Sequence, residues 1–132
     1  MTKEWQKAIS SGDTEQVRAL LDAGTDMNAV DRYGQTAIMN AAHKGHSEIV
    51  RHLTQRGADM NRTAKFGLSA LMLAVIANHP EVVRVLVDAG ADTTLRGSPR
   101  TAPIYNKTAL ELAEQMARAQ GAEILRQAAV KP

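Results

Sequence analysis

Histidines are the side chains of this chain whose chemistry could most readily support catalysis or metal binding, and their spacing argues against both. His43 and His46 are three residues apart, but Gly45 lies between them and breaks a helix that would align them, and no carboxylate stands beside them at ligand spacing. The other two are His52 and His79. The chain has no cysteine, glycine-rich phosphate loop, serine nucleophile elbow or catalytically spaced acid pair. We therefore expect no enzyme activity, no cofactor and no metal site.

The aromatic residues repeat in a pattern that suits recognition. Three of the four, Tyr33, Phe66 and Tyr105, each stand three positions before a hydroxyl residue. Exposed aromatic rows are costly unless they contact something, and aromatic anchors dominate many protein interfaces. We expect these three to form a row that contacts a partner, with the shielding of a neighbouring turn as the alternative. The hydroxyl residues are Thr36, Ser69 and Thr108.

Positive charge gathers around this row. We call residues 29–35, 62–68 and 95–107 the first, second and third fingers; together they hold six cations and one anion, Asp31. Outside the fingers, ten of the 16 cations stand against 13 of the 14 anions. A basic strip of this kind steers acidic partners, with screening over about 10 Å at ordinary salt. The six cations are Arg32, Arg62, Lys65, Arg96, Arg100 and Lys107.

The elements that must position these residues recur every 33 residues. The segment 24–28, Gly-Thr-Asp-Met-Asn, returns at 57–61 as Gly-Ala-Asp-Met-Asn and at 90–92 as Gly-Ala-Asp, and small and branched apolar positions follow the same step. A fixed period of this size indicates a solenoid, in which each unit leaves an apolar face that the next unit covers.

One unit reads as two helices and a finger. Thr36 is a good N-cap for a short first helix that must end near Gly45, and a second helix is predicted from Ser47 to Gln55 with an apolar stripe facing the first. Gly57 ends that helix, and the finger follows as an extended turn.

Charged residues also recur along the second helices. Stacking lines them into two columns, which we interpret as a solvated surface with weak i,i+3 pairs rather than a partner surface. The columns are Glu15, Glu48 and Glu81, and Arg18, Arg51 and Arg84.

Four segments together resemble the ankyrin repeat, whose pattern is Asp-x-x-Gly-x-Thr-Pro-Leu-His-x-Ala-Ala, then Gly-His-x-Glu-Ile-Val, then Gly-Ala-Asp-x-Asn. They are residues 31–38, 41–42, 45–50 and 57–61, and further copies cover 5–31, 64–94 and about 105–129. The resemblance implies an all-α ankyrin-repeat solenoid of about four stacked helix-turn-helix units with β-hairpin-like fingers. It also places His46 and His79 at the family's histidine position, where we expect them to fix the turn between paired helices.

The predicted organisation is a single domain over residues 1–132. Its units are about 1–31 as an amino-terminal cap, 32–64, 65–103 with a long finger, and 104–132 as a carboxy-terminal cap. Trp5 is expected to cover the open amino-terminal end, and the first helix of the last unit is expected to run from Thr108 through Gln120. Its polar outer surface is assigned to Glu114, Gln115, Arg118 and Gln127.

The chain departs from the family pattern at several positions, at the starts of the first helices and in the fingers. The Pro-Leu-His that follows the capping hydroxyl in the family is absent from every copy, and Asp31 becomes Ala64, which weakens the bond that closes the second finger. Gly34 and Gly67, where positive φ is expected, become Asn106. Six residues are inserted in the third finger, which we interpret either as a partner-selecting loop or as a tolerated insertion.

Composition limits the remaining classes. The net charge of +2 is too small to indicate nucleic acid by itself, and no stretch approaches the roughly 20 apolar residues needed to span a bilayer. The amino terminus lacks the apolar run of a signal peptide, and the absence of cysteine suits a reducing compartment. We expect a cytoplasmic protein without a membrane segment.

The expected function is that of a non-enzymatic scaffold that binds another protein, expected to be acidic, through a concave surface of fingers and first helices. The alternative is a polyanion or nucleic acid bound by the basic finger edge, although six cations over three fingers are few for that purpose. We expect a monomer, with self-association through an end or the third finger as the alternative. The predicted contact residues are Arg32, Tyr33, Gln35, His43, Lys44, Lys65, Phe66, Leu68, Ile76, Ala77, Arg100, Tyr105 and Lys107.

Overall fold

Helices make up the regular structure of the chain, which the computed structural model describes over residues 1–98 and 106–130. An isolated antiparallel bridge joins Val30 and Thr36 at the base of the first finger. The helices are α1 (Lys3–Ser11), α2 (Thr14–Asp22), α3 (Ala37–Lys44), α4 (Ser47–Gln55), α5 (Ala70–Ile76), α6 (Pro80–Asp88), α7 (Ala109–Gln115) and α8 (Ala119–Val130), with a 3-10 turn, η1 (Lys65–Gly67), in the second finger.

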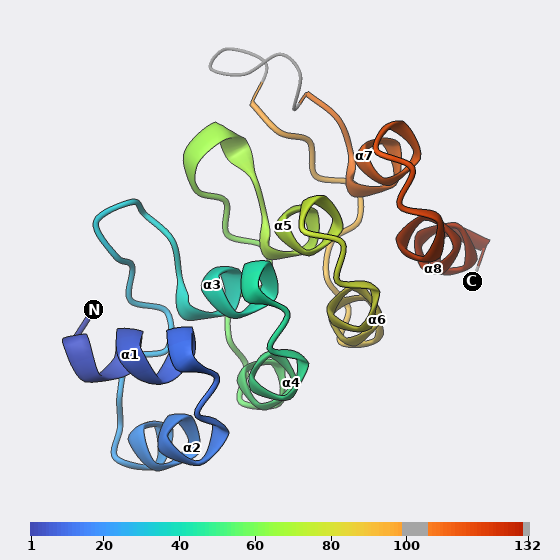
Figure 1. Cartoon of the computed structure of the whole chain (residues 1–132). Coiled ribbons are helices and arrows are strands. Elements are labelled where there is room, and N and C mark those ends of the chain that lie inside the picture. The colour runs from blue at the N-terminus through green and yellow to red at the C-terminus, as the bar shows by residue number, and fades with distance from the viewer. Residues whose placement is uncertain (99–105, 131–132) are drawn as a thin grey trace.

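The helices stack as four pairs in series, which confirms the predicted all-α solenoid (Figure 1). The first helices α1, α3, α5 and α7 form one row, and each contacts the next. The second helices α2, α4, α6 and α8 form a parallel row beside it. The fingers project from the side of the first row, and we call the surface formed by the fingers and the first helices the inner face.

The caps of the first helices follow the sequence closely. The backbone N–H of Met39 donates to Thr36 Oγ1 at 3.4 Å, and that of Met72 donates to Ser69 Oγ at 3.3 Å. Helix α4 has the predicted bounds, and α3 ends at Lys44 before Gly45. Residues at the finger bases are thereby held to the start of the helix that follows.

The core runs through the stack without interruption. Trp5, Ile38 and Leu71 occupy the same position in successive units and are 0%, 1% and 2% exposed. Trp5 is therefore fully buried in the first unit, where its large ring takes the place that a smaller aliphatic side chain has in the next two units. Burying an aromatic ring of this size contributes several kcal/mol at about 25 cal/mol per Å².

Adjacent units are also tethered by hydrogen bonds whose carbonyl acceptors, on the first helices, recur every 33 residues. The Nε2–H of His46 donates to the carbonyl of Ser10 at 3.3 Å, and that of His79 donates to the carbonyl of His43 at 3.1 Å. The two histidines thus reach back to the preceding first helix as well as standing at the turn. The third tether runs from the Nη2 of Arg118 to the carbonyl of Ile76 at 2.8 Å.

The last unit differs from the prediction. Helix α7 ends at Gln115 rather than near Gln120, because Ala117 adopts a left-handed conformation with φ of 58° and breaks the helix. Arg118 is half-buried and forms the third tether, so its assignment to the polar outer surface was wrong. The other three residues assigned to this surface, Glu114, Gln115 and Gln127, are exposed, and Glu114 forms an ion pair with Arg126 at 3.1 Å.

In the charge columns on the second helices, Arg51 forms exposed ion pairs. Arg51 lies 2.5 Å from Glu48 of its own helix and 3.7 Å from Glu81 of the next unit. Exposed pairs of this kind contribute about 0.2–1 kcal/mol each. They support the stacking order without dominating it.

Candidate partner-binding site

A hollow of about 260 Å³ lies on the inner face between the first and second fingers and helices α3 and α5. Six of the predicted contact residues meet there, although they come from two units. Its lining combines apolar walls with a few polar groups, the composition typical of ligand sites. The residues lining it are Gln35, His43, Ala64, Lys65, Phe66, Leu68, Leu73 and Ile76.

The first finger is closed by a carboxylate. Asp31 Oδ1 accepts from the backbone N–H of Tyr33 at 2.8 Å and from that of Gln35 at 3.0 Å, while Oδ2 accepts from Asn40 Nδ2 at 3.4 Å. Tyr33 is 65% exposed, and the Arg32 guanidinium lies 5.7 Å from its ring centroid. The tip therefore presents an aromatic ring and a cation to solvent, just outside the hollow.

The second finger is built differently because Ala64 replaces the aspartate. Its tip is a 3-10 turn in which Phe66 takes a left-handed backbone conformation, with φ of 65°. That conformation costs a bulky residue roughly 1–2 kcal/mol. The half-buried Phe66 ring lines the hollow, and Lys65 Nζ lies 5.1 Å from its centroid.

The first helices supply the rest of the hollow. Ile76 at the end of α5 is half-buried, and His43 near the end of α3 is exposed. Sequence reasoning missed Leu73, which lies one helical turn before Ile76 and is 9% exposed. The i,i+3 spacing of these two residues on one helix is the signal that could have found it.

The other predicted contact residues are distributed unevenly. Leu68 is only 7% exposed and belongs to the core, so it offers a partner little area. Ala77, half-buried at the end of α5, and the exposed Lys44 lie outside the hollow. Lys107 is half-buried, and its carbonyl accepts from the backbone N–H of Gly97 at 3.2 Å. The predicted contacts Arg100 and Tyr105 lie outside the residues that the structure describes.

The basic strip is weaker than the sequence suggests. Arg96 of the third finger forms an ion pair with Glu111 at 3.0 Å, so part of its charge is neutralised. The hydrogen bond from the Thr108 backbone N–H lowers the pKa of Glu111, and the positive charges of Arg96 and Lys107 act in the same direction. Arg32 and Lys65 remain beside the aromatic rings at the finger tips.

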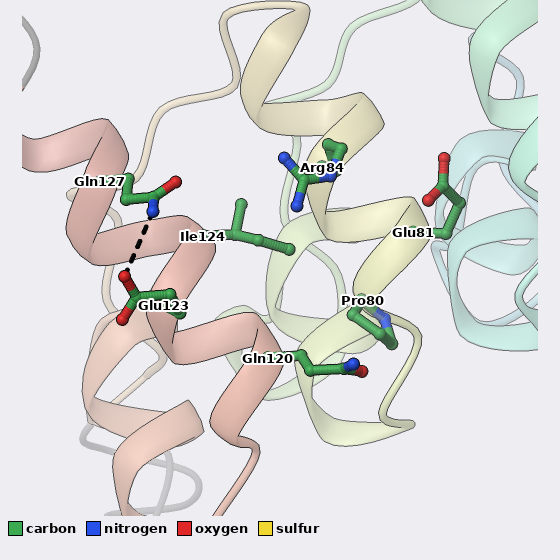
Figure 2. A pocket seen from close by; sticks show the side chains of 7 residues that line it. All are labelled: Pro80, Glu81, Arg84, Gln120, Glu123, Ile124 and Gln127. Carbon is green, nitrogen blue, oxygen red and sulfur yellow. Dashed lines mark hydrogen bonds between the residues drawn. The ribbon is translucent and has the colours of Figure 1, made fainter.

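A second hollow, of about 330 Å³, lies on the outer row between α6 and α8 (Figure 2). Arg84 lines this hollow. The two charge columns do not continue into α8, because Gln120 occupies the position equivalent to Glu81 and Glu123 occupies the position equivalent to Arg84. Glu123 accepts a hydrogen bond from Gln127 at 3.2 Å. Ile124 is 8% exposed at the floor, so this hollow is a competing site with mixed charge.

Within residues 1–98 and 106–130, no group of three or more metal-ligating side chains comes together. Over the same residues, the helices are too short and too polar to cross a bilayer.

Stacked antiparallel helix pairs, projecting fingers and tethers repeated at a fixed step define a helical repeat protein. A family model described as ankyrin repeats, in three copies, matches residues 5–97 and 56–131. The chain belongs to the ankyrin repeat family. A search of curated proteins returns no match to it. Ankyrin repeats are generally protein–protein interaction modules and typically non-enzymatic scaffolds.

Proposed function

We propose that this protein is a non-enzymatic scaffold that binds an acidic segment of a partner protein at the inner-face hollow. The observation that carries the proposal is the meeting of residues from two fingers and two first helices around one concavity. An extended segment carrying an apolar side chain and a carboxylate fits this chemistry. The apolar group would occupy the space between Phe66, Leu73 and Ile76.

Affinity in this proposal comes mainly from the aromatic rings. Tyr33 is exposed, and Phe66 forms one wall of the hollow. Aromatic residues at the centre of an interface contribute more than most contacts because they bury a large area at a small cost in side-chain entropy.

Charge supplies the preference for an acidic partner. Among the residues that the structure describes, the hollow is lined by Lys65 and by no carboxylate, and the one acidic residue of the neighbouring finger, Asp31, is engaged in closing its own turn. A carboxylate on the partner can therefore approach Lys65 without an opposing charge in the lining. Such complementarity affects orientation and association rate more than affinity.

Selection from a peptide display library on the immobilised protein tests the proposal directly. The expected winners carry acidic residues beside one large apolar residue. Measured by calorimetry, Tyr33→Ala and Phe66→Ala should each weaken binding by about 1–3 kcal/mol. Lys65→Glu should slow association, and the effect should shrink at high salt.

Matched changes elsewhere provide the controls. Val130→Ala removes an exposed apolar side chain far from the hollow, and Arg84→Glu reverses a charge in the outer hollow. Both should leave binding unchanged. Loss of binding with Arg84→Glu but not with Lys65→Glu would move the site to the outer row. Selection of polyanions whose affinity falls steeply with salt would favour the nucleic-acid alternative.

A further inference from the structure

Within the residues that the structure describes, the third finger touches the second at Gly97 and Ser98. The backbone N–H of Ser98 donates to the carbonyl of Phe66 at 2.7 Å. A Cβ added to Gly67 would lie only 2.6 Å from the Ser98 nitrogen and 3.2 Å from the Gly97 carbonyl carbon. Glycine at position 67 is thus required by close approach of the third finger as well as by its own φ of 71°.

No equivalent approach to the first finger is made by the residues that the structure describes. Gly34 occupies the position of Gly67 one unit earlier and has a similar φ of 75°, but a Cβ added there would meet no atom of the described chain within 4 Å. Its turn is held from within by Asp31. The second finger has Ala64 at the position of Asp31, and Gly97 and Ser98 of the third finger lie against its tip.

Residues 96–98 of the third finger, which include the contact with the second finger, are fixed by bonds to the start of the last helix pair. The backbone N–H of Gly97 donates to the carbonyl of Lys107 at 3.2 Å, and Gly97 is buried. Arg96 donates to the carbonyl of Asn106 at 3.3 Å and pairs with Glu111 at the start of α7. Residues 96–98 therefore connect the last helix pair to the tip of the second finger.

The second finger is closed at its base by its own backbone bonds, from the N–H of Ala64 to the carbonyl of Leu68 at 3.1 Å and from the N–H of Gly67 to the carbonyl of Ala64 at 2.9 Å. We infer that residues 96–98 of the third finger position Phe66: the Ser98 N–H adds the bond that fixes the Phe66 carbonyl and so holds Phe66 in its left-handed conformation. The consequence for binding rests on the proposed function, because Phe66 forms a wall of the hollow. Residues far along the chain would then control the shape of the site by docking on it. Ser98 and Gly97 are positioning residues that need not touch the partner.

Ser98→Pro tests this inference because proline lacks the N–H that bonds to Phe66. The Cα and Cβ chemical shifts of Phe66, read by NMR in the full chain without any partner, report its backbone conformation. They should move towards ordinary values in Ser98→Pro and stay in place in Ser98→Ala, which keeps the backbone donor. Unchanged Phe66 shifts in Ser98→Pro would overturn the inference.

A second pair of variants separates steric docking from backbone strain. Gly67→Ala and Gly34→Ala introduce the same strain at positive φ, but only the first drives a methyl group into Ser98. Signals of residues 95–98 should shift in Gly67→Ala and not in Gly34→Ala. Equal spectra for residues 95–98 in both variants would contradict docking.

Binding provides the functional readout. For an acidic peptide selected on the parent protein, Ser98→Pro should weaken affinity about fivefold relative to Ser98→Ala, as expected for the loss of one neutral hydrogen bond. Shifted Phe66 signals with unchanged affinity would overturn the positioning role. If the parent selects no acidic peptide, the proposed function fails, while the Phe66 shifts still decide whether the third finger holds the second.

Discussion

Three residues other than glycine have left-handed backbone in the described part of the chain: Phe66, Asn78 and Ala117. Asn78 and Ala117 end the first helices of their units at the position where Gly12 and Gly45 end theirs, with φ of 63° and 58° against 73° and 79°. Asparagine tolerates this region better than alanine does. Ala117 is therefore a point of backbone strain in the last unit.

Ala117→Gly should stabilise the protein by about 1 kcal/mol, because glycine removes the Cβ that opposes this conformation. Denaturant unfolding followed by circular dichroism measures the effect. Ala19→Gly, the same change within α2 where φ is helical, should destabilise by about 1 kcal/mol instead. Destabilisation by both changes would show that Ala117 is not strained.

The capping box of α7 makes the stability of the protein depend on pH through Glu111. The Thr108 backbone N–H donates to Glu111 Oε1 at 3.2 Å and lowers the pKa of that carboxyl below its ordinary 4.5. A carboxyl with a depressed folded pKa stabilises the folded state above its unfolded pKa, and the contribution is lost as the pH falls through the folded value. Stability thus declines on the acid side.

Glu111→Gln isolates this effect, since glutamine keeps an acceptor for the cap but carries no charge. The variant should be less stable than the parent at pH 7, and the difference should close as the pH falls below about 4. Unfolding curves at several pH values measure it. A difference that stays constant down to about pH 2 would exclude the charge as the cause.

At the scale of elements, each hydrogen bond that tethers two units involves two positions. One is the residue whose side chain donates the bond, and the other is the residue of the preceding unit against which that side chain packs. A Cβ at Gly45 would lie 2.7 Å from the His79 ring, so the histidine tether needs glycine at that position. In the last pair of units, Asn78 stands where glycine would be, and the longer Arg118 replaces histidine. The two positions are therefore coupled.

Arg118→His should destabilise the protein by about 1–3 kcal/mol, because the ring would meet the Asn78 Cβ and leave the Ile76 carbonyl unpaired. Adding Asn78→Gly should recover most of that loss. Thermal or denaturant unfolding of the two single variants and the double variant gives the coupling energy. If the changes in unfolding free energy of the two single variants add up to that of the double variant, the Arg118 tether does not depend on residue 78.

The elements show how far the sequence could predict the structure. The bounds of α4 and the N-caps of α3 and α5 follow from local signals, an apolar stripe and a hydroxyl residue, and these were predicted. Helix α7 breaks at Ala117, and because no glycine stands there to indicate a helix end, α7 was predicted too long. Arg118 bonds to Ile76 of another unit and Ser98 bonds to Phe66 of another finger, and such partners depend on packing between distant segments rather than on local pattern.

At the scale of the whole molecule, the fourth unit carries a charged pair at a position that is apolar in the units before it. Ile9, Ala42 and Val75 occupy one position in successive units and are buried, whereas the fourth unit places Glu114 there, paired with Arg126. An apolar residue at this position in a terminal unit would be left uncovered. The ion pair thus keeps the end of the described stack polar.

Glu114→Val should create an apolar end surface and promote self-association that increases with concentration. Light scattering after size-exclusion chromatography measures it, with the parent expected to remain a monomer. Glu123→Val, a similar change on the exposed side of α8, is the control. Association of both variants alike would point to general loss of solubility rather than to the end of the stack.

The central claim is that the inner-face hollow receives the partner, and NMR mapping of a bound acidic peptide tests it most directly. On titration, the account predicts that amide signals of Gln35, His43, Lys65, Phe66 and Ile76 shift together and saturate at one stoichiometry. Shifts confined to the outer hollow, at residues such as Arg84, Gln120 and Ile124, would contradict it.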